Sequence, residues 1–237
     1  TQAMDAVGGL LKSGKFVIDL SADYRLKDLK AYEKYYNLKH KDKANIAKAV
    51  YGLPEFYREK IKNAKLIANP GCYPTCAILA LAPFLATSSI ELDTLIIDAK
   101  SGTSGAGKKA VQESLFSEVD EDFRAYKVNT HQHLPEIEQE LSKLAGEKVG
   151  ITFVPHLLPL KRGILETIYL KTNKKLTTED ALALYRRFYK NEPFVRIKEE
   201  GFPSIKDVNF TNFCDIGIKI FGKDIIIIAA IDNLLKG

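Results

Sequence analysis

The sequence has few cysteines and no long apolar run. Its 237 residues contain three cysteines, and a small, odd number in a chain of this length does not indicate a disulfide framework. No apolar stretch approaches the roughly 20 residues of a membrane-spanning helix. We therefore expect a cytoplasmic protein without a membrane partner. No signal peptide is recognisable, and because the chain opens at Thr1 as though in mid-helix, we expect it to be a piece of a longer protein.

The sequence also lacks a concentrated basic patch. Its 35 basic and 30 acidic residues give a formal net charge of +5, and the lysines are scattered. Nucleic-acid binding depends on basic residues gathered on one face, so we expect no nucleic-acid partner. A mild positive balance instead suits a small anionic substrate through electrostatic steering. No internal repeat or low-complexity linker is present, and one or two globular domains are expected.

One cysteine, Cys72, lies between a predicted strand and a predicted helix. Residues 64–68 form a short apolar run that Asn-Pro-Gly ends, and residues 76–85 form the dense apolar run of a buried helix. Pro74 fits the first turn of that helix, where its missing N–H is not needed. A thiol at a helix N-terminus faces unpaired N–H groups and the positive end of the helix dipole, which favours the thiolate. This pattern is typical of a nucleophile.

A packing role is the alternative for Cys72, because cysteine is among the most frequently buried residue types. The stretch by itself leaves catalysis and packing open. Cys76, one turn further along the helix among Ala, Ile and Leu, is expected in the core. Cys214 has no helix start to activate it.

The order of predicted elements indicates an α/β protein with two different halves. The first half is predicted to begin with a helix that Gly14 ends, followed by a buried strand at 15–20. A loop at 21–25 follows at the carboxyl end of that strand, the edge where open α/β sheets bind ligands. It continues with surface helix and loop at 28–50, and with a turn at 51–55 before another short helix. The second half is predicted to hold strands at 94–100, 149–156 and 163–170, a helix at 177–190 capped by Thr177 or Thr178, and an antiparallel pair at 213–221 and 224–230 joined at Gly222. Adjacent strands without crossovers predict a mixed or antiparallel sheet there.

Glycines and a lysine follow the strand at 94–100. Residues 101–109 nearly match the phosphate-binding loop of nucleotide hydrolases, but Lys109 stands where a Mg²⁺-binding hydroxyl belongs. This difference argues against a nucleoside triphosphate. The glycines still allow backbone N–H groups to approach an anion or cofactor closely, and a flexible connector is the alternative.

Two of the four histidines, His131 and His133, precede a predicted amphipathic helix with Pro135 in its first turn. Together with Cys72 and Cys76 they could form a metal site, but this spacing is not a typical zinc pattern, and no metal is predicted. A histidine that acts as general acid/base for Cys72 explains the same residues with fewer ligands. A surface histidine at a helix start is the third interpretation.

Seven motifs, in order along the chain, resemble the N-acetyl-γ-glutamyl-phosphate reductase family of arginine biosynthesis. The matching stretches are Asp19-Leu20-Ser21-Ala22-Asp23-Tyr24-Arg25-Leu26-Lys27-Asp28, Tyr51-Gly52-Leu53-Pro54-Glu55, Asn69-Pro70-Gly71-Cys72-Tyr73-Pro74-Thr75, Ser101-Gly102-Thr103-Ser104-Gly105-Ala106-Gly107, His131-Gln132-His133-Leu134-Pro135-Glu136-Ile137, Pro155-His156-Leu157-Leu158-Pro159 with Arg162-Gly163, and Asn212-Phe213-Cys214-Asp215. The family's glycine-rich nucleotide-binding turn would lie before Thr1. The resemblance implies that residues 1–70 are the C-terminal part of a Rossmann-type NADP-binding domain. Residues 71–237 would then form an α+β catalytic and dimerisation domain.

The resemblance also implies a mechanism and roles for single residues. NADPH reduces an acyl phosphate through a thioester on Cys72, and His133 transfers the proton, with His131 as the neighbour that matches the same motif. Arg25, Arg162 and His131 would bind the anionic acyl-phosphate substrate. Cofactor contacts would come from Ser21, Ser101, Gly102 and Asn233, and the protein would be a homodimer or homotetramer.

Other functions remain open from the sequence. Aspartate-semialdehyde dehydrogenase is a related acyl-phosphate reductase, but the motifs around Cys72 and His133 fit it less well. A carrier-linked aminoadipyl-phosphate reductase of lysine biosynthesis is a closer alternative. A nucleotide-independent thiol hydrolase or acyltransferase would use the same cysteine and histidine. A non-catalytic subunit-contact domain is the last alternative.

Overall fold

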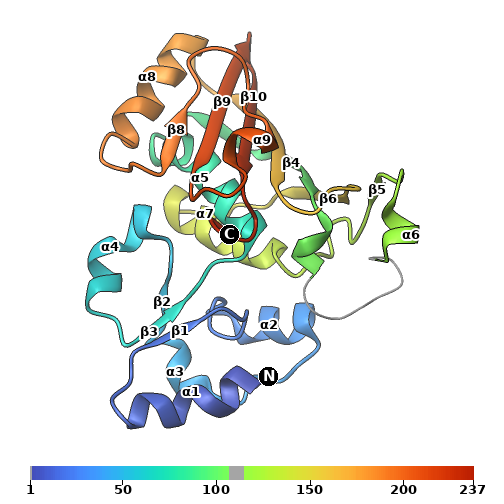
Figure 1. Cartoon of the computed structure of the whole chain (residues 1–237). Coiled ribbons are helices and arrows are strands. Elements are labelled where there is room, and N and C mark those ends of the chain that lie inside the picture. Colours follow the sequence, from blue (N-terminus) through green and yellow to red (C-terminus); the bar gives the residue numbers. More distant parts are fainter. Residues whose placement is uncertain (1, 107–114) are drawn as a thin grey trace. The chain divides into compact units, whose positions relative to one another are not determined.

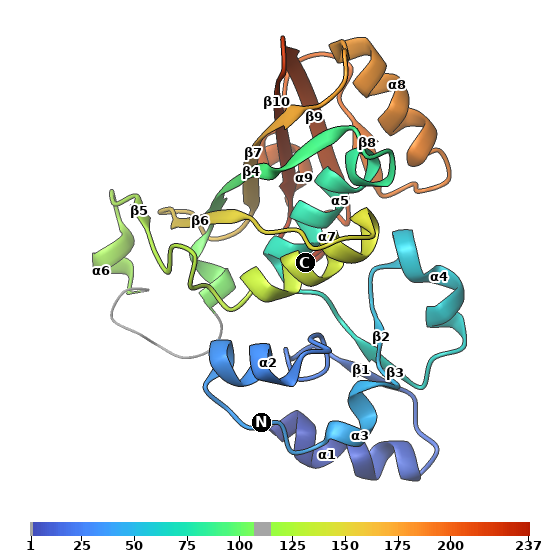
Figure 2. The same ribbon diagram turned by 180° about the vertical axis from the view of Figure 1, so that it is seen from behind.

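The computed structural model describes residues 2–106 and 115–237. The chain divides into two compact units, Thr1–Gly71 and Cys72–Gly237, called the first and second unit below. Each is described on its own, and Figures 1 and 2 show the elements of both from opposite sides. Within the described residues, no helix combines the length and apolar character needed to cross a membrane.

The first unit is an α/β unit with a small parallel sheet, as predicted. Strand β3 lies between β1 and β2 and pairs in parallel with both. Helix α1 is followed by Gly14, whose φ of +76° suits a residue without a side chain. The elements are α1 (Gln2–Lys12), β1 (Val17–Asp19), α2 (Leu29–Tyr36), α3 (Lys43–Ile46), β2 (Val50–Tyr51), α4 (Pro54–Lys62) and β3 (Leu66–Ala68).

The prediction of a buried strand at 15–20 is wrong in part. β1 covers only Val17–Asp19. Its outward-facing Ile18 is 56% exposed, and the flanking residues Phe16 and Leu20 are 52% and 72% exposed. The reason is that only one face of β1 is covered: Val17 on that face packs in the core with Val7 and Leu66, whereas Ile18 points the other way. An apolar run does not show which of its two faces is covered.

The predicted surface segment at 28–50 has one deeply buried side. Tyr32 of α2 is fully buried, and its hydroxyl donates to Asp23 at 2.7 Å. Asp28 caps α2 by accepting the backbone N–H of Lys30 at 2.8 Å. The short strand β2 was not predicted, since only two residues pair there.

The second unit is built on a seven-stranded mixed sheet, which confirms the prediction for this half. The strand order is β5-β6-β4-β7-β10-β9-β8, with parallel pairs β4–β6 and β8–β9 and antiparallel pairs elsewhere. The strands are β4 (Ile90–Ser101), β5 (Arg124–Ala125), β6 (Thr152–Leu157), β7 (Ile164–Thr172), β8 (Val195–Ile197), β9 (Cys214–Phe221) and β10 (Asp224–Ile231). Gly222, at φ +59°, makes the predicted turn between β9 and β10.

Helices cover one face of this sheet. The helices described in this unit are α5 (Cys72–Ala86), η1 (Thr103–Ala106), α6 (Phe116–Val119), α7 (Leu134–Ala145), α8 (Thr178–Phe188) and α9 (Ile205–Val208). Of these, α5, α8 and α9 contact strands of the sheet, and α7 packs against α5. Thr177 caps α8 in a reciprocal box with Asp180, as the sequence predicted. The short elements β5, β8, α6 and α9 were not predicted.

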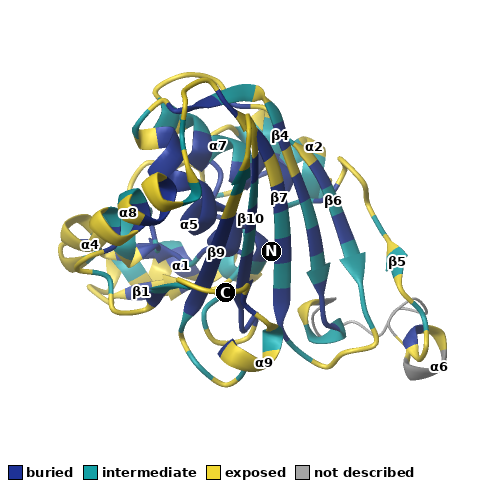
Figure 3. Ribbon diagram, turned by 90° about the horizontal axis from the view of Figure 1, so that it is seen from above, coloured by how far each residue is buried: buried dark blue, intermediate teal, exposed yellow. Residues whose placement is uncertain are grey.

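Helix α5 is the central helix of the second unit. Every residue from Tyr73 to Leu85 is buried, and α5 packs against α7 and against strands β4, β7 and β10. Figure 3 shows the sheet strands with buried and less buried residues in alternation, as expected when helices cover a single face. Because the core holds α5 in place, its first residue, Cys72, has a fixed position.

Candidate active site

Cys72 is the first residue of α5 and is half-buried, whereas Cys76 and Cys214 are fully buried. Burial raises the pKa of the Cys76 thiol well above its ordinary value, and the neighbouring Cys214 adds to this shift. Cys76 is therefore a core residue, as predicted. Among the three cysteines, Cys72 alone combines a helix N-terminus with access to solvent.

Tyr73 brings the start of α5 together with the predicted histidine pair. Its buried ring makes edge-on contacts with the rings of His131 and His133, at centroid distances of 5.4 and 5.9 Å. The structure therefore places Cys72, His131 and His133 around one tyrosine. Sequence reasoning gave Tyr73 no role, although it lies inside the motif that contains Cys72.

His131 is buried, so the interpretation as a surface histidine is wrong for this residue. Its Nδ1 accepts the backbone N–H of His133 at 3.0 Å, and its Nε2 lies 3.5 Å from the hydroxyl of Tyr126. Burial lowers the pKa of His131 to about 2, with the nearby His133 and Lys127 adding to the effect. His131 is thus a neutral imidazole with both nitrogens engaged.

His133 occupies the N-cap position of α7 and is half-buried. Pro135 follows in the first turn, as predicted. The His131 and His133 rings contact each other at a centroid distance of 4.8 Å. Of the two histidines, His133 has the access that proton exchange with a substrate requires.

Two tyrosine hydroxyls lie beside the histidines. The Tyr73 and Tyr126 hydroxyls are 3.1 Å apart. Burial raises the pKa of Tyr126 to about 12 and also raises that of Tyr73. Both side chains are therefore uncharged at neutral pH. Tyr126 lies in no recognisable motif, and only the fold shows its place.

The glycine-rich loop after β4 packs against the segment before β7. The N–H of Gly102 donates to the carbonyl of Gly163 at 3.0 Å, and a Cβ on Gly102 would lie 2.7 Å from the backbone nitrogen of Arg162. Glycine is needed here for close backbone approach, and the described part of the loop is a packed 3₁₀ turn rather than a free connector. Ser101 ends β4 and is buried. The remaining loop residues of the prediction, 107–109, lie outside the described residues.

Asn233 ties this loop to the end of the chain. Its Oδ1 accepts the N–H of Gly163 at 2.7 Å, and its Nδ2 donates to the hydroxyl of Ser104 at 3.1 Å. The turn that starts at Asp232 ends at Gly237, where a Cβ would lie 2.5 Å from the Cβ of Cys72. The predicted residue Asn233 is therefore in the neighbourhood of the predicted nucleophile.

Arg162 lies at the same end of the sheet. Its Nη1 pairs with the fully buried carboxylate of Asp232 at 3.0 Å, and its guanidinium lies 4.2 Å from the ring centroid of Phe210. Neither Asp232 nor Phe210 was singled out from the sequence. Neither residue lies in one of the seven matching stretches.

The other two predicted site residues, Ser21 and Arg25, lie in the first unit, in the loop after β1. The Ser21 hydroxyl donates to Asp19 at 2.9 Å. Arg25 is buried and donates to the carbonyls of Leu20 and Asn69, at 3.1 and 2.6 Å. Arg25 therefore links the loops that follow the carboxyl ends of β1 and β3, the sheet edge where α/β folds bind ligands.

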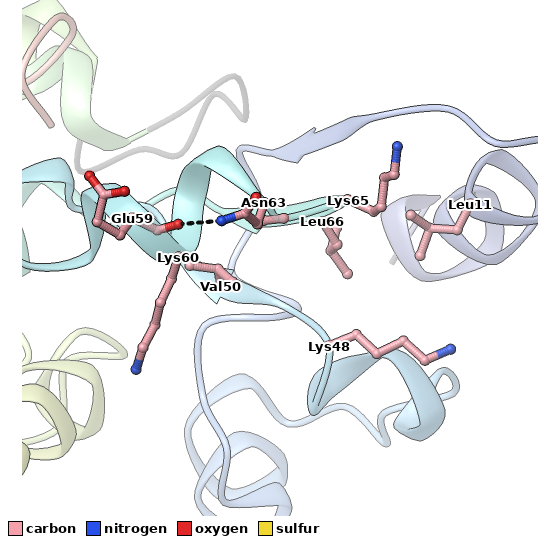
Figure 4. A pocket seen from close by; sticks show the side chains of 9 residues that line it. Leu11, Lys48, Val50, Glu59, Lys60, Asn63, Lys65 and Leu66 are labelled. Carbon is pink, nitrogen blue, oxygen red and sulfur yellow. Dashed lines mark hydrogen bonds between the residues drawn. The ribbon is translucent and has the colours of Figure 1, made fainter.

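One pocket of the first unit lies away from the predicted site residues. It has a volume of about 740 Å³ and is lined by none of the predicted site residues. Figure 4 shows Lys48 and Lys65 among the residues that line it, and the hydrogen bond from Asn63 to the Glu59 carbonyl. The pocket is open to solvent and contains none of the residues to which the sequence assigns chemistry, so it is not part of the candidate active site. No group of three or more His, Cys, Asp or Glu side chains in residues 2–106 and 115–237 is arranged to hold a metal ion.

Comparison with known proteins agrees with the geometry around Cys72. The family model for the semialdehyde dehydrogenase dimerisation domain matches residues 72–233, and that for the semialdehyde dehydrogenase NAD binding domain matches residues 1–64. N-acetyl-gamma-glutamyl-phosphate reductases from Pelotomaculum thermopropionicum and Geobacter sp. (strain M21) are 50% and 53% identical over 99% of this chain, which spans 69% of each relative. The chain belongs to the N-acetyl-gamma-glutamyl-phosphate reductase family. It is therefore an oxidoreductase of the semialdehyde dehydrogenase type.

Solved structures share the fold with this family member. Aspartate semialdehyde dehydrogenase II from Vibrio cholerae superposes with a TM-score of 0.73 at 14% sequence identity, and the match covers all of this chain and 72% of that one. The enzyme from Francisella tularensis gives a TM-score of 0.69 at 16% identity, over 99% of this chain and 75% of the other. At these identities the likeness concerns the fold alone.

Proposed function

We propose that this protein reduces N-acetyl-L-glutamyl 5-phosphate to N-acetyl-L-glutamate 5-semialdehyde and phosphate in arginine biosynthesis, with NADPH as the reductant. The single observation that carries this proposal is the identity of about one half, over nearly the whole chain, to several reductases of that name. The half-buried Cys72 at the start of α5, beside two histidines, supplies the chemistry such a reaction needs.

Cys72 acts as the nucleophile. Its thiolate attacks the acyl carbon, the bond from that carbon to the phosphate oxygen breaks, phosphate leaves, and a thioester remains on Sγ. The N-terminal end of α5 favours the thiolate. A sulfur nucleophile suits this route because it both attacks readily and leaves readily.

His133 acts as the general acid/base, and His131 orients it. His133 is half-buried at the N-cap of α7, whereas both nitrogens of His131 are engaged and its pKa of about 2 keeps it neutral. A neutral, fixed imidazole cannot exchange protons near pH 7. His133 therefore moves the proton at the substrate oxygen when the semialdehyde leaves Sγ.

The described residues fit NADPH, which when bound supplies the hydride that reduces the thioester. In the first unit, the parallel strands β1 and β3 carry at their carboxyl ends the loop with Ser21 and Arg25. We infer that residues 1–70 belong to the nucleotide-binding domain and that Ser21 contacts the cofactor. In the second unit, Ser101, Gly102 and Asn233 form the packed loop near Cys72 that we assign to the nicotinamide side.

In the second unit, we infer that Arg162 binds an anionic group of the substrate and that His131 lines its site. Arg25 stays a predicted substrate residue of the first unit, where its Nε and Nη2 donate to the carbonyls of Asn69 and Leu20. A guanidinium suits carboxylate and phosphate because it donates two parallel hydrogen bonds. Reducing conditions in the cytoplasm would keep the three cysteines, none of which is in a disulfide, as thiols.

We further propose that the protein is a homodimer, or a homotetramer built from such dimers. The support is the match of residues 72–233 to a dimerisation domain and the uncovered face of the sheet, where Ile96, Tyr169 and Phe221 are exposed. Exposed apolar side chains on a flat sheet face are typical of a subunit interface. Tyr169→Asp is expected to reduce the molar mass measured by light scattering.

The activity is tested in the reverse direction. The protein is mixed with NADP⁺, N-acetylglutamate semialdehyde and phosphate, and NADPH formation is followed by absorbance. We expect turnover that requires phosphate. Turnover only with a carrier-linked aminoadipyl semialdehyde would replace the substrate, and hydrolysis of an activated acyl group without NADPH formation would replace the reaction class.

A further inference from the structure

Two arginines of the second unit have similar surroundings. Arg162 lies 4.2 Å from the ring centroid of Phe210, and Arg196 lies 4.1 Å from that of Phe213. Each guanidinium also pairs with a buried aspartate. The two clusters therefore provide an internal comparison of how many donors each arginine uses within the protein.

The Nε and Nη2 groups of Arg196 are both engaged in hydrogen bonds within the protein. Its Nε and Nη2 donate to the two carboxylate oxygens of Asp215, at 2.6 and 2.8 Å. The Nη2 group also donates to the carbonyl of Asp207 at 3.0 Å. This two-pronged pairing is the strongest that an arginine makes with a carboxylate. Arg196 therefore serves the fold.

Arg162 keeps its Nε and Nη2 edge available. Its one hydrogen bond to a described residue runs from Nη1 to Asp232 at 3.0 Å. The Nε and Nη2 groups, the pair that binds planar anions, make no hydrogen bond with the described part of the chain. Arg162 is therefore oriented by the protein but not saturated by it.

Asp232 determines that orientation. It is fully buried, and its Oδ2 accepts both Arg162 Nη1 and the backbone N–H of Phe210, the latter at 2.7 Å. Phe210 has a φ of +63°, a strained value for a residue with a Cβ. The bond to Asp232 holds the Phe210 backbone in this conformation, which places the ring against the guanidinium.

The same residue also fixes the turn beside the nucleophile. The Oδ1 of Asp232 accepts the N–H of Leu234 at 2.9 Å, and its carbonyl accepts that of Lys236 at 3.0 Å. This turn brings Gly237 so close to Cys72 that a Cβ on the glycine would lie 2.5 Å from the Cβ of Cys72. Asp232 thus connects the arginine to the immediate surroundings of the thiol.

We propose that Asp232 is a positioning residue that holds the Nε and Nη2 edge of Arg162 toward an anionic group of the substrate, either its carboxylate or the transferred phosphate. This inference rests on the proposed function. The Arg162 edge binds the anion, and Asp232 acts through Arg162 without touching the substrate.

The test is a double-mutant cycle with Asp232→Asn and Arg162→Lys, assayed in the reverse direction. Loss of a charge-assisted contact changes affinity by roughly 10- to 100-fold. We expect each variant to raise one KM by about this factor, with the KM for NADP⁺ changed less than twofold. A raised KM for semialdehyde identifies the carboxylate as the bound group, and a raised KM for phosphate identifies the phosphate. The double variant should show no further increase, because Asp232 works through Arg162.

Asp215→Asn is the matched control, since it breaks the equivalent pair at Arg196. It should lower the melting temperature and leave all KM values unchanged. Two results would overturn the proposal: unchanged semialdehyde and phosphate KM values in Asp232→Asn, or single effects that multiply in the double variant. If Asp232→Asn does not fold, Arg162→Lys alone is the test. Unchanged semialdehyde and phosphate KM values in Arg162→Lys would then show that Arg162 does not bind the anionic group. A wild-type protein without NADP⁺ reduction would instead reject the proposed function.

Discussion

His131 accepts the backbone N–H of His133 through Nδ1, at a distance of 3.0 Å. This bond requires an unprotonated Nδ1, so the proton of the neutral ring is on Nε2, which faces the Tyr126 hydroxyl. Burial lowers the pKa of His131 to about 2. The two adjacent histidines therefore have different roles, and the difference is measurable.

We predict that His131 does not titrate between pH 5 and 9. In ¹⁵N-labelled protein, the ring nitrogens of His131 should keep the shifts of one neutral tautomer over this range, because a buried imidazole cannot take up a proton at little cost. His131→Gln removes the signal and provides its assignment. A midpoint between pH 5 and 8 for His131 would contradict this account.

The same shift predicts how His131 affects stability. The folded pKa lies below the unfolded value of about 6.5, so the contribution is complete above pH 6.5 and is lost as the pH falls from there toward about 2. Between pH 7 and 5, the wild type should lose about 2 kcal/mol more unfolding free energy than His131→Gln. Urea titrations of both proteins at the two pH values measure this difference. Equal losses would show that His131 accepts a proton in the fold.

The contribution of Glu166 to stability is expected to change with pH in the opposite direction. Glu166 is fully buried on the inner face of β7, and neither carboxyl oxygen meets hydrogen-bond geometry with a described residue. Burial raises the pKa of Glu166 well above its usual range, an effect that the nearby Cys76 thiol partly opposes. Its stability contribution is complete below about pH 4.5 and is lost as the pH rises, because the unfolded chain then releases a proton that the fold retains.

We therefore expect Glu166→Met to raise the unfolding free energy by about 1–3 kcal/mol at pH 8, with a smaller gain near pH 4. Glu140→Met is the matched control, since Glu140 is equally buried but accepts a hydrogen bond from Gln139 at 2.8 Å. That control should be destabilised. A Glu166→Met protein that is less stable than wild type at every pH would disprove the interpretation.

The two cysteines of α5 should separate activity from stability. Cys72→Ser is expected to lose nearly all reductase activity and to unfold within a few degrees of wild type. Cys76→Ser should keep activity per folded molecule and lose about 1–3 kcal/mol, because it places a hydroxyl in a fully buried position. Parallel assays and thermal unfolding test both. An active Cys72→Ser would remove the nucleophile from the mechanism.

Local signals in the sequence predicted the elements that carry the chemistry. The apolar run after Cys72, the early Pro135 and the Thr177 cap depend on neighbours a few residues away, and each gave the correct helix. The exposed face of β1 was missed because coverage depends on which other elements pack against it. Tyr126 and Phe210 were missed for a similar reason. Their roles come from contacts with residues distant along the chain, Tyr73 and Arg162 respectively.

The most direct test of the account is to look for the thioester itself. The protein is mixed with N-acetyl-L-glutamyl 5-phosphate without NADPH, quenched in acid, digested and examined by mass spectrometry. We predict an N-acetylglutamyl group on the peptide that contains Cys72, released by hydroxylamine, absent in Cys72→Ser and lost when NADPH is added before the quench. A reductase that turns over fully while its Cys72 peptide never carries an acyl group would contradict the central claim.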